Sequence, residues 1–244
     1  MLQQTQVDRV IPKYEAFLKK FPSFKVLAKA AQSEVVKMWH GLGYNRRALG
    51  LRKLAIELQT TNYELPTKNE ELMRLPGIGP YTAEAVRAFA FRAKGATPVD
   101  TNIERVLKRI FGAHKKDRAR IQALAREAVA DDSWSYNHAV MDFGASICTA
   151  RSPKCEICPM KDFCASYPCA GDDIKKVKQS KFEDSDRFYR GKIISALRQN
   201  NILRRKSLGA EVGLSNDEAR LDKIVKSLVR DGFITVKRGT ISLT

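Results

Sequence analysis

The sequence has no run of about 18 consecutive apolar residues, so it offers no candidate for a membrane-spanning helix. The residues after Met1 also lack the basic and apolar regions that form a secretory signal peptide. We therefore expect a cytoplasmic protein without a membrane partner, associated with the nucleoid if its source is prokaryotic.

Acidic residues are scarce relative to basic ones: 27 Asp and Glu stand against 44 Lys and Arg, a formal net charge of +17. An excess of this size suits a polyanionic partner, because each phosphate that a cation neutralises releases condensed counterions. The basic residues are spread along the chain rather than gathered in one tail. This distribution favours a folded basic surface over a disordered arm.

Cysteine is limited to five residues, and four of them follow a compact spacing, Cys148-x6-Cys155-x2-Cys158-x5-Cys164. In a cytosolic protein such a group indicates metal or redox chemistry rather than disulfides. Zinc ribbons use two C-x2-C pairs set far apart, whereas this stretch has one such pair and places all four thiols within seventeen residues. The spacing predicts a [4Fe–4S] cluster on these four cysteines, with Cys169 outside it.

Residues 75–100 combine a glycine turn, an apolar helix and a carboxylate. Pro76 cannot continue a preceding helix, and Gly77 and Gly79 suit positive φ or close approach to another group. Apolar residues then recur at helical spacing, which predicts a helix from about Tyr81. A glycine turn that opens a helix can bind one phosphate through its N–H groups, although the same pattern also serves as a plain connector.

Asp100 directly precedes a second helical pattern. A carboxylate in this position is commonly a helix N-cap, and spacing alone favours that interpretation. A catalytic role for this carboxylate comes only from a family resemblance, which the motifs below carry. Asn102, two residues later, could orient Asp100 or a water molecule by hydrogen bonding.

A second glycine turn, Gly41-Leu42-Gly43-Tyr44, is followed by Arg46 and Arg47. Tyr44 could simply pack in the core, as aromatic residues near helix ends usually do. The flanking glycines and the arginines instead favour an exposed apolar wedge beside charges that bind phosphate.

These motifs, in this order over about residues 1–168, resemble the helix-hairpin-helix–GPD (HhH-GPD) superfamily of DNA glycosylases. The opening string Met-Leu-Gln-Gln-Thr-Gln-Val resembles the MutY-type adenine DNA glycosylases within it. The resemblance implies a mainly α, two-lobed helical domain in which Asp100 faces the sugar of a flipped nucleotide. It also implies a set of DNA-binding residues: Gln4 against the base stack, the wedge residues Leu42 and Tyr44, and the phosphate-gripping hairpin of Leu75, Gly77 and Gly79.

The residue after Pro80 indicates the reaction type within this family. Relatives that also cleave the strand have a lysine there, whose amine forms a Schiff base with the sugar. Tyr81 cannot do so, although it could merely pack at the start of a helix. The resemblance therefore implies a monomeric, monofunctional glycosylase of base excision repair, acting on mispaired double-stranded DNA. Adenine opposite 8-oxoguanine or guanine is the expected target, and Asp100, Tyr81 and Asn102 are the expected catalytic residues.

Two departures from the family keep other functions open. The family has a catalytic glutamate two residues before the position of Met1. We therefore expect a start inside a longer protein, or a thymine or uracil mismatch glycosylase with a better leaving group, or a non-catalytic iron–sulfur DNA-binding protein. The C-terminal residues also do not resemble the Nudix-like domain that reads oxidised guanine in MutY relatives.

The C-terminal residues predict three helices and a β-hairpin with a basic tip at Lys237 and Arg238, the pattern of a winged helix that binds DNA or a protein. We expect Ser215 or Asn216 to cap the third helix. The predicted organisation is an HhH-GPD glycosylase domain over 1–147 (hairpin 75–82), a cluster loop over 148–164, a linker over 165–186 and an α+β winged-helix domain over 187–244.

Overall fold

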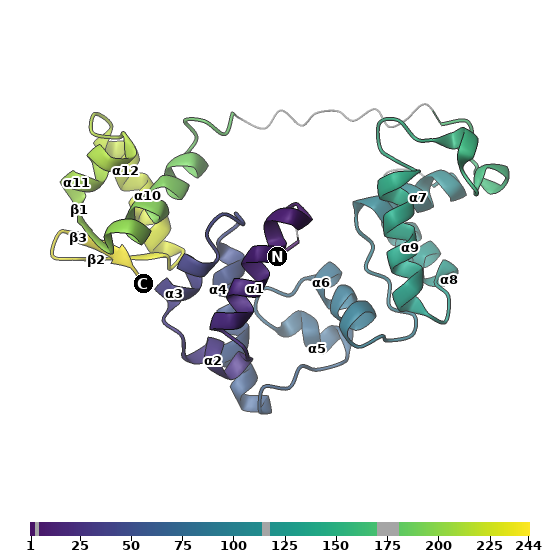
Figure 1. The fold of residues 1–244 in the computed structure, drawn as a ribbon, viewed down its shortest axis with the longest axis horizontal. Coiled ribbons are helices and arrows are strands. Elements are labelled where there is room, and N and C mark those ends of the chain that lie inside the picture. The colour runs from purple at the N-terminus through teal and green to yellow at the C-terminus, as the bar shows by residue number, and fades with distance from the viewer. Residues whose placement is uncertain (3–4, 114–117, 170–180) are drawn as a thin grey trace. The chain divides into compact units, whose positions relative to one another are not determined.

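The computed structural model describes residues 1–2, 5–113, 118–169 and 181–244, so residues 170–180 of the predicted linker lie outside the described part (Figure 1). The chain divides into two compact units, residues 1–64 with 178–244 and residues 65–177. The predicted fold class is confirmed, because the elements are mainly helices and the strands form one small antiparallel sheet. Within the described ranges, no helix is both long and apolar enough to cross a bilayer.

The first part of unit 1 consists of α1 (Val7–Lys20), α2 (Phe24–Lys29), α3 (Gln32–Met38), α4 (Arg46–Glu57) and the short 3-10 helix η1 (Leu58–Thr61). Phe17 of α1 packs edge-on against Phe21 and Trp39, and these rings anchor a core cluster between α1 and α4. The opposite face of α1 exposes a row of apolar side chains: Val7, Ile11, Tyr14 and Leu18.

The second part of unit 1 is the C-terminal module, α10 (Asp186–Asn200), β1 (Ile202–Arg204), α11 (Arg205–Val212), α12 (Glu218–Arg230), β2 (Ile234–Lys237) and β3 (Thr240–Leu243). Strand β3 lies between β1 and β2 and is antiparallel to both. The three helices and the β2–β3 hairpin agree with the prediction. The prediction that Ser215 or Asn216 caps α12 is wrong. The N-cap is Asp217, whose carboxylate accepts the N–H of Arg220, and Leu214 is buried in the turn before it.

The C-terminal module shares its hydrophobic core with the N-terminal helices. Val36 of α3 and Leu49 of α4 belong to the same buried cluster as the apolar residues of α10, α11 and α12. Gln32 donates a hydrogen bond to the carbonyl of Gly232, and Lys37 donates one to Asn201 at 2.8 Å. The module is therefore packed onto α3 and α4 as part of one unit.

Unit 2 contains α5 (Asn69–Arg74), α6 (Pro80–Ala85), the π-helical turn η2 (Val86–Ala90), α7 (Thr101–Phe111), α8 (Arg118–Ala128) and α9 (Ser133–Ser146). Two 3-10 turns follow, η3 (Cys155–Ile157) and η4 (Lys161–Phe163). Ile103 and Leu107 of α7 pack against Ile121 and Ala125 of α8 in the core of this unit. Helices α7, α8 and α9 lie side by side (Figure 1), with α7 carrying Asp100 at its N-terminus.

Candidate active site and cluster loop

Asp100 is the N-cap of α7, and the same carboxylate is half-buried at the protein surface. Its Oδ1 accepts the backbone N–H of Asn102 at 2.9 Å and that of Ile103 at 2.7 Å. Its Oδ2 accepts one longer hydrogen bond, 3.3 Å from the side-chain amide of Asn102. The cap therefore fixes one oxygen and leaves the other with spare acceptor capacity, so the capping and catalytic interpretations of Asp100 are compatible.

Tyr81 lies near Asp100 at the start of α6, with 37% of its residue surface exposed. Partial burial raises the pKa of the Tyr81 hydroxyl, and the negative charge of Asp100 raises it further. The hydroxyl is therefore a neutral hydrogen-bond donor over the physiological pH range, and it offers no amine.

The hairpin joins α5 to α6 through a turn in which the N–H of Ile78 bonds to the carbonyl of Leu75 at 3.2 Å. Gly77 has a φ of +80°, which favours glycine, whereas Gly79 is extended and exposed. A Cβ built on Gly79 would meet no atom within 4 Å. The space beside Gly79 is open to an incoming group, as the phosphate-binding expectation requires.

Glu84 of α6 ties the hairpin helix to the segment that leads into Asp100. Its Oε2 accepts the N–H of Thr97 at 3.0 Å, and its Oε1 accepts a hydrogen bond from Arg87 at 3.0 Å. Thr97 itself is only 3% exposed. These partly buried hydrogen bonds fix the start of the segment that leads to Asp100 against α6.

Arg105 links the Asp100 site to the cysteine loop, a role that our sequence analysis missed. Its Nη2 donates to Oδ1 of Asn102 at 2.8 Å and to the carbonyl of Gly144 at 2.5 Å. Its Nε donates to the carbonyl of Cys148 at 2.8 Å. Because Asn102 in turn bonds to Asp100, a continuous chain of hydrogen bonds runs from the first cysteine to the candidate catalytic carboxylate.

Gly144 of α9 permits the close packing of α9 on α7 at this point. A Cβ built there would lie 2.9 Å from Cβ of Asn102 and 3.3 Å from the carbonyl oxygen of the same residue. No side chain fits without moving Asn102. The glycine therefore helps to set the position of the residue that contacts Asp100.

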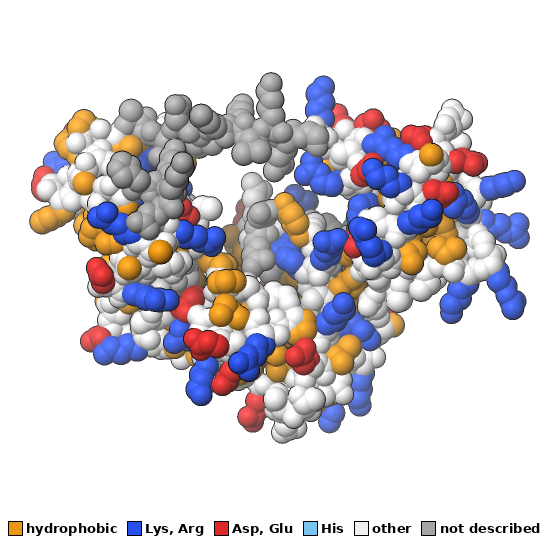
Figure 2. Space-filling view, turned by 180° about the vertical axis from the view of Figure 1, so that it is seen from behind, with side chains coloured by type: hydrophobic (Ala, Val, Ile, Leu, Met, Phe, Trp, Pro, Cys, Tyr) orange, Lys and Arg blue, Asp and Glu red, His pale blue; other side chains and the backbone are white. Residues whose placement is uncertain are grey.

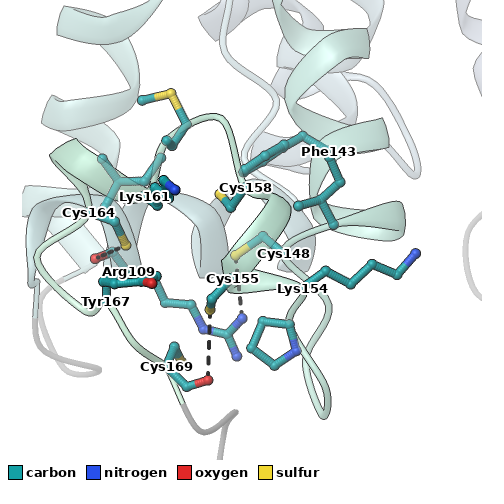
Figure 3. A pocket seen from close by; sticks show the side chains of 14 residues that line it. Arg109, Phe143, Cys148, Lys154, Cys155, Cys158, Lys161, Cys164, Tyr167 and Cys169 are labelled. Atoms are coloured by element: carbon teal, nitrogen blue, oxygen red, sulfur yellow. Dashed lines mark hydrogen bonds between the residues drawn. The ribbon is translucent and has the colours of Figure 1, made fainter.

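The four cysteines of the predicted cluster line one pocket and face a common space (Figure 3). Its other walls combine apolar side chains, such as Phe143 and Met160, with the cations Arg109, Lys154 and Lys161, and Cys169 lines it as a fifth thiol. Within the part of the chain that the structure describes, no histidine or carboxylate lines this pocket. Among the described residues, no group of three His, Cys, Asp or Glu side chains converges as a single metal ion would require. Four thiols around one space are the donor set that a [4Fe–4S] cluster uses.

Arg109 braces this pocket from α7, and its side chain is buried, with 6% of the residue surface exposed. Its guanidinium donates to the carbonyls of Thr149 at 2.8 Å and Ala150 at 3.0 Å, and it lies 3.4 Å from Sγ of Cys148. The Sγ of Cys164 lies 3.4 Å from the backbone oxygen of Arg109. One residue therefore contacts both ends of the cysteine loop.

The Gly41-Leu42-Gly43-Tyr44 turn belongs to unit 1 and separates α3 from α4. Tyr44 is 63% exposed and adopts a φ of +47°, and the guanidinium of Arg47 lies 5.5 Å from its ring centroid. Leu42 is only 3% exposed, so the expectation of an exposed leucine wedge is wrong for this structure. Gly41 and Gly43 both have positive φ and turn Leu42 into the core, while Thr5 and Arg47 bond to its carbonyl.

Arg46 is the first residue of α4, and its guanidinium pairs with Asp231 at 2.8 Å. The Asp231 carboxylate also pairs with Arg190 at 2.6 Å and is almost completely buried. The Arg46 side chain is nevertheless 72% exposed, so its outer face stays open to a ligand. Gln4, the remaining predicted DNA-binding residue, lies outside the described part of the chain.

The sequence carried a signal for the residues that were missed. Asn102, Arg105 and Arg109 follow one another at intervals of three and four along α7, so they lie on one side of the helix. The spacing therefore places Arg105 and Arg109 on the side of α7 that begins at Asn102, which was predicted, although it does not identify their partners.

Comparison with known proteins agrees with this arrangement. Residues 1–131 match the family described as HhH-GPD superfamily base excision DNA repair protein. Residues 148–164 match the iron–sulfur binding domain of endonuclease III. The predicted iron–sulfur cluster on Cys148, Cys155, Cys158 and Cys164 is thereby confirmed.

Several curated relatives and solved structures are similar to this chain. The adenine DNA glycosylase of Mycolicibacterium smegmatis is 36% identical over 96% of this chain and 81% of its own length. The human adenine DNA glycosylase is 38% identical over 68% of this chain and 31% of its own. A structure described as a thermostable thymine-DNA glycosylase has a TM-score of 0.64 and 34% identity, covering 68% of this chain and 79% of that one. A trapped endonuclease III–DNA covalent intermediate has a TM-score of 0.60 and 29% identity, covering 66% and 78%.

Proposed function

Since the chain belongs to the HhH-GPD superfamily of base excision DNA repair proteins, we propose that it is a monofunctional adenine DNA glycosylase. It would hydrolyse the N-glycosidic bond of an adenine mispaired with 8-oxoguanine or guanine in duplex DNA. Similarity to adenine DNA glycosylases over 96% of the chain supports adenine as the target.

The main support for the proposal is the way in which hydrogen bonds hold the Asp100 carboxylate. Two backbone amides and Asn102 hold it in one orientation, while Oδ2 keeps spare acceptor capacity at a half-buried surface position. When the bond between sugar and base breaks, the electron pair leaves with the base and the sugar becomes an oxocarbenium-like cation. A fixed carboxylate oxygen stabilises that charge without having to reorganise, and water then adds to the sugar.

The hairpin and Tyr44 have supporting roles in this proposal. The base must leave the duplex stack before its glycosidic bond is accessible. Leu75, Gly77 and the open space beside Gly79 would hold a backbone phosphate, and the exposed ring of Tyr44 would press into the stack. Leu42 has no part in the proposal, because it is buried.

Tyr81 supports the absence of lyase activity. A neutral phenol cannot form the Schiff base that strand cleavage requires, and its raised pKa keeps it protonated beside Asp100. Borohydride reduction during turnover would therefore trap no covalent complex between the protein and DNA. Any trapped complex would show that an amine of another residue acts as a lyase and would refute this part of the proposal.

Base release from defined duplexes tests the proposal. The protein is expressed from the whole reading frame that carries this sequence and is given adenine opposite 8-oxoguanine, adenine opposite guanine, thymine opposite guanine and uracil opposite guanine. Asp100→Asn is the matched variant, since asparagine is also a good N-cap and preserves α7 while removing the charge. We expect release of adenine by the wild-type protein and its loss in Asp100→Asn, with duplex binding retained.

The other arms of this assay identify the alternatives. The likeness to the thermostable thymine-DNA glycosylase structure makes thymine opposite guanine the second candidate substrate. Release of thymine or uracil without adenine would replace the substrate assignment and keep the enzyme. If no base is released from any duplex, the protein is a non-catalytic iron–sulfur DNA-binding protein.

A further inference from the structure

The exposed side of α12 in the C-terminal module is lined by cations. Lys223, Lys226 and Arg230 recur at intervals of three and four, so they lie on one face of the helix, and all three are exposed. The opposite face, with Leu221, Ile224, Val225 and Leu228, is buried in the module core. We call these three cations the α12 stripe, and by helix geometry it is about 10 Å long.

The α12 stripe borders a surface depression of about 380 Å³ between α10 and α12. Four basic residues line it, the three of the stripe and Arg190, against the single carboxylate of Asp186. Figure 2 shows many Lys and Arg side chains, in blue, on the C-terminal module at the right of the view. Residues 187–244 hold 13 Lys and Arg against five Asp and Glu, so the module itself is strongly basic.

The nearby carboxylates are already engaged by other cations. Asp186 is paired with Arg220 at 3.1 Å and with Lys223 at 3.2 Å, and Asp231 is held by Arg46 and Arg190. Arg230 is 78% exposed and approaches Asp231 only at 4.0 Å. Lys226 makes no ion pair with any residue that the structure describes. Lys226 and Arg230 are thus the charges left for an external anion.

The α12 stripe lies next to Arg46, one of the residues that the sequence predicts to bind DNA. Arg46, which follows the exposed Tyr44, and Arg230, at the end of α12, both approach Oδ1 of Asp231, at 2.8 Å and 4.0 Å. The two guanidinium groups therefore lie on either side of one carboxylate, which places the end of the α12 stripe next to Arg46. All of these residues belong to unit 1.

We infer that the C-terminal module binds the sugar–phosphate backbone of the same duplex through the α12 stripe, extending the DNA surface beyond Tyr44 and Arg46. Along one DNA strand a charge recurs about every 3.4 Å of helix axis, so a stripe about 10 Å long can face more than one phosphate. The stripe presents no acidic or aromatic side chain for reading base edges. Its contacts would therefore hold the duplex without selecting its sequence. This inference depends on the proposed function only in that the duplex reaches Arg46.

The salt dependence of duplex binding tests this inference. The variant is Lys226→Gln/Arg230→Gln in the full chain, and the matched control is Lys25→Gln/Lys29→Gln, which removes two exposed cations from α2 of the same unit. Binding to an undamaged duplex of about 30 base pairs is followed by fluorescence anisotropy between about 50 and 200 mM salt. Far-UV circular dichroism and Tm verify that both variants are folded.

We expect the α12 variant to bind every duplex sequence more weakly. Its plot of log K against log salt should also be less steep than that of the wild type, by about 2 in the slope. Its loss of affinity would be about tenfold larger at the low end of that salt range than at the high end. The control should keep most of the wild-type slope.

Three results would overturn the inference: an unchanged slope in the α12 variant, an equal loss in the Lys25/Lys29 control, or a loss confined to single-stranded RNA of the same length. An unchanged slope would make an acidic protein the partner of the stripe. An equal loss in the control would mean that the net charge of the protein, rather than the α12 stripe, determines the affinity for DNA. If no duplex releases a base but the α12 variant alone binds weakly, the proposed function fails and this inference stands.

Discussion

Replacing Gly144 by alanine would test how closely α9 must approach the Asp100 site. The new methyl group would lie 2.9 Å from Cβ of Asn102 and 3.3 Å from both the carbonyl oxygen of Asn102 and Cγ2 of Val106. Cβ is the root of the Asn102 side chain and cannot rotate away from the contact. Either α7 and α9 must separate, or Asn102 must move relative to Asp100.

Two opposing effects set the magnitude of the change in stability. Overpacking of this kind costs about 1–3 kcal/mol. Alanine in a helix interior gains about 1 kcal/mol over glycine, since the backbone of Gly144 has no positive φ that alanine would strain. The net loss of unfolding free energy is therefore about 0–2 kcal/mol. The loss of activity should be larger, because a displacement of about 1 Å at a reacting group can cost about a hundredfold in rate.

The measurement is single-turnover base release, together with Tm and iron content, for Gly144→Ala and a control. Gly191→Ala is the matched control: Gly191 also lies in a helix, and a Cβ there would meet nothing within 4 Å. We expect the control to be slightly stabilised and fully active. If Gly144→Ala releases base at the wild-type rate with an unchanged Tm, the contact between α9 and Asn102 does not position Asp100.

Three further changes probe other parts of the structure. Tyr44→Ala removes an exposed ring, so it should weaken base release in the single-turnover assay while Tm stays unchanged. Arg109→Met leaves the carbonyls that it bonds unpaired, at about 1–3 kcal/mol each, and should lower the iron content and visible absorbance of the purified protein. Burial, the largest influence, would raise the pKa of Asp231, but Arg46 and Arg190 outweigh it and lower the pKa below its ordinary value. That stabilisation is complete above the ordinary carboxyl pKa of about 4 and disappears as the pH falls through the lower folded value. Asp231→Asn should therefore cost roughly 3 kcal/mol near neutral pH, and its loss relative to wild type should shrink in acid denaturation curves.

The sequence was most informative where chemistry is local. The spacing of Cys148, Cys155, Cys158 and Cys164 predicted the cluster because a compact set of thiolates leaves few other uses. The N-cap position of Asp100 and its contact with Asn102 followed from residues two positions apart, and both are present. Such contacts depend on backbone geometry that neighbouring residues determine.

Prediction was least successful where contacts join distant parts of the chain. Arg105 and Arg109 reach carbonyls about 40 positions away, and nothing in their immediate sequence specifies those partners. Leu42 was misplaced because flanking glycines with positive φ can direct a side chain either outward or inward. The pairing of Arg46 with Asp231 spans 185 positions and depends on how the C-terminal module packs.

The shared cluster of Val36 and Leu49 with the C-terminal helices has a consequence for how the protein is made. On the ribosome, α3 and α4 emerge long before the residues that cover them, with all of unit 2 synthesised in between. Until α10 and α12 arrive, the apolar side chains of Val36 and Leu49 remain in contact with water. A nascent chain that stops after the cysteine loop would therefore expose an apolar surface to which chaperones can bind. A truncation at the 3′ end of the gene would destabilise α3 and α4 as well as the C-terminal helices.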